Sequence, residues 1–124
     1  MEPINIKPTP KTPTILLDPA QGIIEIKGRS HPENSAEFYR PVMTWLENYA
    51  QKPLEKTTVN IQLELFNTSS SKCILDMFKK LEAMHKANNK VVVNWYYEDD
   101  DEDGLDAGEN YKYMVGVPFN LIAY

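Results

Sequence analysis

Four consecutive hydroxyl residues, Thr68, Ser69, Ser70 and Ser71, are the part of the sequence whose chemistry most needs an explanation. They stand between an apolar stretch that ends at Phe66 and a stretch with helical spacing. One helix needs only one N-cap, so most of these hydroxyls have no evident structural task. A helix N-terminus also offers free N–H groups and a partial positive charge, which tolerate a phosphate. The cluster is therefore a candidate phosphorylation site, and the simpler interpretation is one cap with exposed neighbours.

The other residues that could carry chemistry form no catalytic pattern. His31 and His85 are far apart, and no spacing of Cys and His resembles a zinc site. Cys73, the single cysteine, falls near the apolar side of the second helix and is expected to be a buried structural thiol rather than a nucleophile. No phosphate-binding loop, nucleophile elbow or dinucleotide fingerprint is present. We therefore expect a protein that is not an enzyme and uses no cofactor.

The acidic run at residues 98–103 resembles part of a calcium-binding loop. From Asp99 it reads D-x-D-x-D-G, the first half of an EF-hand loop, but position 12 is Asn110, where the pattern requires Glu. No metal site is expected here. The preferred interpretation is a solvated loop whose acids favour the N-terminus of the next helix. The alternatives are a docking surface for a basic partner, or assistance with a partner's Mg²⁺.

Composition narrows the class of protein. The chain has 124 residues, 42% of them hydrophobic, and a net charge of −5. The acidic run alone carries six negative charges, so the rest of the chain is almost neutral and has no basic stripe for nucleic acid. No stretch of about 18 apolar residues predicts a membrane span, and the N-terminus lacks the apolar region of a signal peptide. With one cysteine, these features predict a soluble cytoplasmic protein.

The elements that must position the hydroxyl cluster follow from periodicity and turn residues. Residues 1–13, rich in proline, predict an extended tail, and residues 14–124 predict one domain. The predicted strands are 14–18, 23–28, 57–66, 91–97 and 117–124. The first predicted helix is capped by Asn34 or Ser35, and the other two begin at 69 and at 104. Strand–helix–strand repeats imply parallel pairing, to which the opening hairpin adds one antiparallel strand. The predicted fold is a mixed five-stranded α/β sheet with helices mainly on one face.

The strand before the hydroxyl cluster alternates strictly. Val59, Ile61, Leu63 and Leu65 are expected to face the core, and Phe66 the opposite side. The alternation therefore predicts a strand with one apolar and one more polar face.

The first helix carries a second apolar stripe that includes Phe38, Trp45 and Tyr49. A helix that covers one sheet needs only one stripe of about 100°. Two interpretations are open. The second stripe is buried under the N-terminal tail and the loop after residue 51, or its aromatic residues anchor a partner, as aromatic residues commonly do.

Three stretches together resemble the SiaC-type regulatory phosphoproteins of bacteria. They are "HPENSAEFYRPVMTWLENY", "FNTSSSKCILDMF" and "WYYEDDDEDGLDAGENYKYMVGVPFNLI", and the similarity spans about residues 14–122. The family has an architecture similar to STAS domains, which agrees with the order of elements predicted above.

This resemblance implies a partner-switching function. A kinase of the histidine-kinase-like ATPase class phosphorylates a threonine that corresponds to Thr68, and a PP2C-type phosphatase removes the phosphate. The unphosphorylated form binds and activates a diguanylate cyclase with a GGDEF domain. Asn67, Ser69, Ser70 and Ser71 would then belong to the partner-binding surface, with one serine as the cap. The alternative is a constitutive scaffold or small-ligand module in which Thr68 is only a helix cap.

Overall fold

The chain folds into six strands and three helices, and the structure, a computed structural model, describes residues 1–124. The strands are β1 (Ile4–Ile6), β2 (Thr14–Asp18), β3 (Ile23–Ser30), β4 (Lys56–Phe66), β5 (Lys90–Tyr97) and β6 (Phe119–Ala123). The helices are α1 (Ser35–Tyr49), α2 (Thr68–Lys86) and α3 (Glu102–Met114). None of the three is both long and apolar enough to cross a lipid bilayer.

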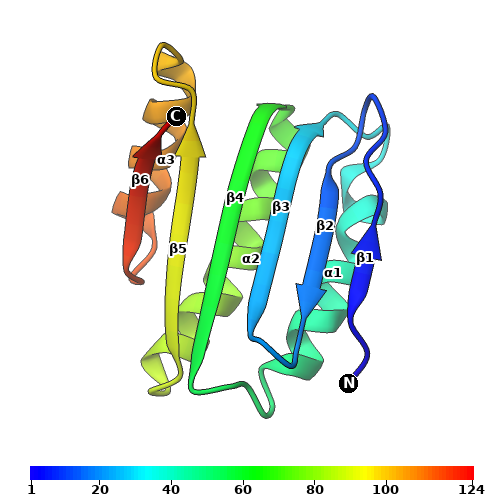
Figure 1. Cartoon of the computed structure of the whole chain (residues 1–124), viewed down its shortest axis with the longest axis vertical. Coiled ribbons are helices and arrows are strands. Elements are labelled where there is room, and N and C mark those ends of the chain that lie inside the picture. Colours follow the sequence, from blue (N-terminus) through cyan, green and yellow to red (C-terminus); the bar gives the residue numbers. More distant parts are fainter.

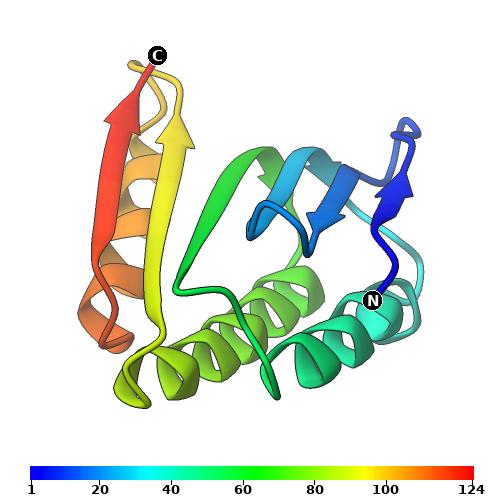
Figure 2. The same ribbon diagram turned by 60° about the horizontal axis from the view of Figure 1, so that its bottom comes forward.

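The strands lie in the sheet in the same order as in the chain. β1, β2 and β3 pair antiparallel, and β3 to β6 pair parallel, with one helix in each parallel connection. All three helices cover the same face of the sheet (Figures 1 and 2). The predicted mixed α/β domain with helices on one face is confirmed.

The sheet has six strands where five were predicted, and the additional one is β1. It comes from the proline-rich segment that the sequence analysis assigned to a tail. Ile4 pairs with Leu17 and Ile6 with Ile15, so these side chains share the face that the helices cover. The backbone is extended, as the prolines require, but a strand of 3 residues gives too short an alternation to be recognised.

The core lies between the sheet and the helices. On α2, the apolar side chains at helical spacing are all buried: Ile74, Met77, Phe78, Leu81 and Met84. Phe78 packs edge to face against Tyr111 of α3 and Phe119 of β6, with ring centroids 5.1 and 5.6 Å apart. These aromatic contacts join the middle of α2 to the last helix and strand.

A β-bulge at Glu64 interrupts the alternation predicted for β4. Gly28 of β3 pairs with Leu63, but the next residue, Arg29, pairs with Leu65, so Glu64 is an extra residue. One extra residue moves the following side chains to the opposite face. Leu65 is 55% exposed, whereas Phe66 is half-buried and packs edge-on against Trp95. The prediction that Leu65 faces the core and Phe66 the other side is therefore wrong.

Candidate functional site

The helix α2 begins directly after β4, at Thr68, and its N-cap is Asn67. The Asn67 side-chain oxygen accepts a hydrogen bond from the backbone N–H of Ser70 at 2.8 Å. The prediction that a serine caps this helix is wrong, because the capped N–H lies three residues after the cap and belongs to Ser70. Thr68 is the first helical residue and not the cap, which removes the structural role that the scaffold alternative gave it.

Ser70 is fully buried and binds residues far away in the sequence. Its hydroxyl accepts from the Ser30 hydroxyl at 2.8 Å and donates to the Ser30 carbonyl at 3.2 Å. The Ser35 hydroxyl, at the start of α1, lies 2.8 Å from that of Ser69 and 3.1 Å from that of Ser70. These bonds place the N-termini of α1 and α2 side by side at the end of β3.

Tyr39 completes this hydroxyl network from the second turn of α1. Its hydroxyl lies 2.6 Å from that of Ser30, with which it exchanges a hydrogen bond. Burial of the ring raises the pKa of Tyr39 to about 12, although the hydrogen bond with Ser30 acts in the opposite direction. Tyr39 therefore stays a neutral phenol and serves as a packing and hydrogen-bonding residue.

Ser71 ties the same helix to α3. Its hydroxyl lies 2.7 Å from the Tyr111 hydroxyl, which also donates to the Ser71 carbonyl at 3.0 Å. Burial raises the pKa of Tyr111, while the hydrogen bond with Ser71 opposes that shift. Ser71 is therefore occupied in a structural contact.

Thr68 differs from the three serines in its surroundings. It is exposed, and its hydroxyl makes no hydrogen bond, whereas Ser69 is exposed but bonded to Ser35 and Asn67. At the first position of α2 it lies beside N–H groups that have no partner within the helix. An added phosphate at this position would meet the positive end of the helix dipole without displacing a buried group.

The residues that hold the serines were not found by sequence reasoning. Each contact links residues that are distant in the sequence. Ser35 lies 34 residues before Ser69, Ser30 lies 40 before Ser70, and Tyr111 lies 40 after Ser71. Tyr39 lies 9 residues after its partner Ser30. No local pattern links such positions, because only the packing of α1 and α3 against α2 brings them together.

The aromatic stripe of α1 is mostly buried. Trp45 stacks on Tyr49 with ring centroids 4.8 Å apart, and its Nε1 donates to the carbonyl of Glu2 at 3.1 Å. The Tyr49 hydroxyl lies 2.9 Å from that of Thr57. Phe38 is half-buried against Tyr39. The structure thus places Trp45 under the N-terminal segment, while the Tyr49 hydroxyl accepts from the N–H of Leu54, in the loop after residue 51, at 3.3 Å. A role of this stripe as partner anchors stays a prediction.

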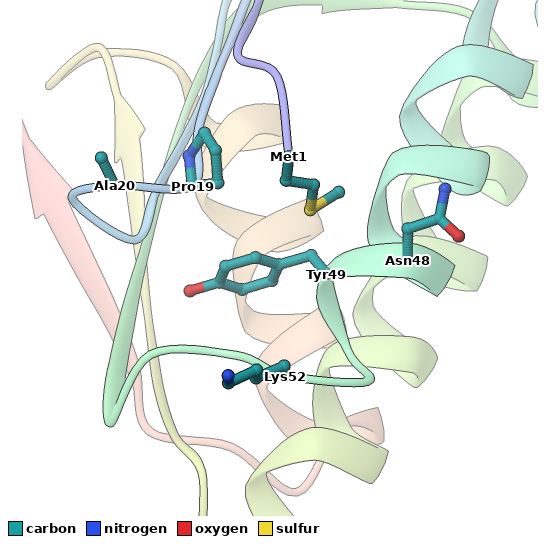
Figure 3. A pocket seen from close by; sticks show the side chains of 6 residues that line it. All are labelled: Met1, Pro19, Ala20, Asn48, Tyr49 and Lys52. Carbon is teal, nitrogen blue, oxygen red and sulfur yellow. The ribbon is translucent and has the colours of Figure 1, made fainter.

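A pocket of about 460 Å³ lies at the far end of α1, away from the hydroxyl cluster (Figure 3). Its lining residues are Met1, Pro19, Ala20, Asn48, Tyr49 and Lys52. Ser35, which touches the cluster, stands at the opposite end of this helix of 15 residues, about 20 Å along its axis. Lys52 is its one charged side chain, so the pocket offers no pair of groups for acid–base chemistry.

The acidic run ends in the N-terminus of α3. The Asp101 carboxylate caps this helix by accepting from the N–H of Gly104 at 3.0 Å, and Glu102 and Asp103 occupy its first turn. This arrangement agrees with the preferred interpretation of the run. No group of three or more His, Cys, Asp or Glu side chains lies close enough to hold a metal ion.

The histidines and the cysteine lie apart from the hydroxyl cluster or act structurally. His31 is exposed, and the His85 Nδ1 accepts from the N–H of Val91 at 3.2 Å. Cys73 is half-buried, and burial raises the pKa of its thiol, which keeps it protonated. This is the environment of an unreactive thiol.

The chain matches one known protein family over almost its whole length. Residues 6–124 match the model of the SiaC family regulatory phosphoproteins. The chain belongs to the SiaC family. It is 32% identical over 127 residues to an uncharacterised protein of Pseudomonas aeruginosa strain UCBPP-PA14, with 100% of this chain and 98% of that protein covered.

Solved structures of the SiaC family have the same fold. SiaC of Pseudomonas aeruginosa matches with a TM-score of 0.93 and 28% identity over the whole of both chains. A crystal structure of the diguanylate cyclase SiaD in complex with its activator SiaC, also from Pseudomonas aeruginosa, matches with a TM-score of 0.93 and 29% identity, covering 98% of this chain and 99% of that one. This chain is thus a regulatory phosphoprotein by family.

Proposed function

We propose that this chain is a partner-switch protein whose binding partner is set by reversible phosphorylation of Thr68. A histidine-kinase-like serine/threonine kinase adds the phosphate and a PP2C-type phosphatase removes it. The unphosphorylated form binds and activates a diguanylate cyclase, as SiaC is paired with SiaD in the matching complex. The chain itself performs no catalysis.

One observation carries the choice of Thr68. Among the four consecutive hydroxyls it is the one that is exposed and makes no hydrogen bond. Phosphorylation of Ser70 would require a buried network to open, and phosphorylation of Ser71 would break its contact with Tyr111. A kinase reaches Thr68 with no such rearrangement.

The physical basis of the switch is a charge added to an otherwise intact fold. A phosphate at the first position of α2 adds about −1.5 to −2 charges and three acceptors, and the helix N-terminus stabilises it. The fold is therefore expected to survive, while any partner that covers Thr68 with an apolar or acidic surface would have to bury this charge. Loss of the output complex follows from that cost.

The acceptor assignment is tested by incubating the wild type, Thr68→Ala and the matched control Ser69→Ala with the kinase and ATP. Mass spectrometry of the intact chain should find one phosphate on the wild type and on Ser69→Ala, and none on Thr68→Ala. One phosphate on Thr68→Ala would show that the acceptor is another residue.

The switch is tested by binding to the cyclase. The phosphorylated wild type should bind at least about tenfold more weakly than the unphosphorylated form, a difference of about 1.4 kcal/mol. Equal affinities would contradict the proposed switch even if Thr68 is the acceptor.

A further inference from the structure

The bulge in β4 turns an apolar side chain outward close to Thr68. Leu65, directly after the extra residue, is 55% exposed, although Leu63 before it is buried in the core and Phe66 after it is half-buried. Bulges commonly re-aim a side chain next to a functional site. An exposed leucine held on a rigid strand is a suitable contact for a partner, because no loop has to be ordered on binding.

The sheet opens at the same place. Pairing between β4 and β5 ends at Ile61 and Trp95, yet β4 continues to Phe66 and β5 to Tyr97. The two strands diverge toward this end of the sheet (Figure 1). The start of α3 faces the last residues of β4, and a groove of about 250 Å³ lies between them. Leu63, Leu65 and Phe66 supply its apolar surface.

The rim of this groove is acidic. Glu64, Asp101 and Asp103 all line it. Arg29 offsets one of these three negative charges, since its Nε lies 3.3 Å from a Glu64 carboxylate oxygen. The rim therefore keeps a net charge of about −2 at neutral pH. An apolar groove with an acidic rim complements a segment that carries an apolar side chain beside arginine or lysine.

The groove adjoins the proposed phosphorylation site. Phe66 lies two residues before Thr68, so the chain places the two at most about 7 Å apart. A phosphate on Thr68 would add about −1.5 to −2 charges beside a rim that is already negative. A basic partner would therefore bind the phosphorylated form more tightly and be released when the phosphate is removed. That order of preference fits the enzyme that removes the phosphate, and not a partner that needs the unphosphorylated form.

We propose that the groove formed by residues 63–66 of β4 and the start of α3 is the docking site for a basic segment of the phosphatase. This inference rests on the proposed function. It also assigns a task to the acidic run, whose last residues both cap α3 and form the rim of the groove.

The test measures hydrolysis by the PP2C-type phosphatase of chains carrying phosphothreonine at position 68. The groove variants are Glu64→Gln/Asp103→Asn and, separately, Leu65→Ala. The matched control is Asp76→Asn/Glu109→Gln, which removes the same number of exposed carboxylates outside the groove. Circular dichroism verifies that each variant is folded.

Both groove variants should lower kcat/KM at least about tenfold through a higher KM, with kcat at saturating substrate unchanged. The control should stay within about twofold of the wild type. Added salt should lower kcat/KM of the wild type toward the value for Glu64→Gln/Asp103→Asn, because salt screens exposed charges.

Two results would overturn the proposal, and they are distinguishable from failure of the proposed function. Groove variants that match the wild type, or a control that falls equally, would show that this groove is not the docking site while dephosphorylation itself stands. A wild-type chain that the phosphatase leaves fully phosphorylated would remove both the proposed function and the docking site that rests on it.

Discussion

Asn67 and the four hydroxyl residues at the start of α2 have separate tasks that only three-dimensional contacts distinguish. Asn67 caps the helix, Ser70 is buried under α1, and Ser71 is bonded to Tyr111. Sequence patterns located the strand end and the helix start to within one residue. They could not identify the cap, because a shift of one residue in the helix start changes which side chain faces the third N–H. Thr68, exposed at the first position of the helix, is the one whose hydroxyl has no hydrogen-bond partner.

The cap assignment predicts which of two neighbouring substitutions lowers stability. Asn67→Ala should lower the free energy of unfolding by about 1 kcal/mol, because it leaves the N–H of Ser70 without its acceptor. Thr68→Ala should change it by less than about 0.5 kcal/mol, since its side chain is exposed and unbonded. Urea unfolding measures both changes, provided that the dependence of the free energy of unfolding on urea concentration has the same slope in each variant. Asn67→Asp, which keeps a capping oxygen, serves as the control, and a larger loss for Thr68→Ala than for Asn67→Ala would contradict the assignment.

At the scale of elements, the alternation in β4 was a reliable guide up to Leu63 and failed beyond it. Val59, Ile61 and Leu63 are buried, as predicted. Nothing in the letters of "LELF" marks the extra residue at Glu64, because a bulge is set by how β3 and β4 pair and not by the composition of one strand. The order of helices and parallel strands, by contrast, was predictable because each element has its own period.

The bulge predicts unequal effects of the same substitution two positions apart. Leu63→Ala should lower the free energy of unfolding by about 2–5 kcal/mol, because it leaves a cavity in the core. Leu65→Ala should change it by no more than about 0.5 kcal/mol, since this side chain is largely in solvent. Chemical unfolding monitored by circular dichroism compares the two. Similar large losses for both leucines would mean that the alternation continues and that no bulge turns Leu65 outward.

At the scale of the whole molecule, the N-terminal segment joins the sheet to the outer surface of α1. β1 adds an edge strand beside β2, and the residues before it reach Trp45, whose Nε1 donates to the carbonyl of Glu2 (Figure 2). The sequence predicted both an extended segment here and two possible uses of the aromatic stripe. Only the assembled fold shows that the segment lies over that stripe, since the two are separated by some forty residues. Any partner that uses Trp45 as an anchor must first displace this segment.

Removal of residues 1–7 should therefore uncover Trp45. The fluorescence of Trp45 should shift to longer wavelength. The free energy of unfolding should fall by about 2 kcal/mol, because the deletion removes the half-buried side chains of Ile4 and Ile6. Trp95 is the second fluorophore and is buried under α3, where its Nε1 donates to the carbonyl of Gly104. The same deletion in a Trp45→Phe chain should thus leave the emission of Trp95 unchanged, which separates local uncovering from general loosening. If the deletion leaves the emission of the Trp45-containing chain unshifted, the N-terminal segment does not cover this side chain in solution. The aromatic stripe would then be open to a partner without any displacement of β1.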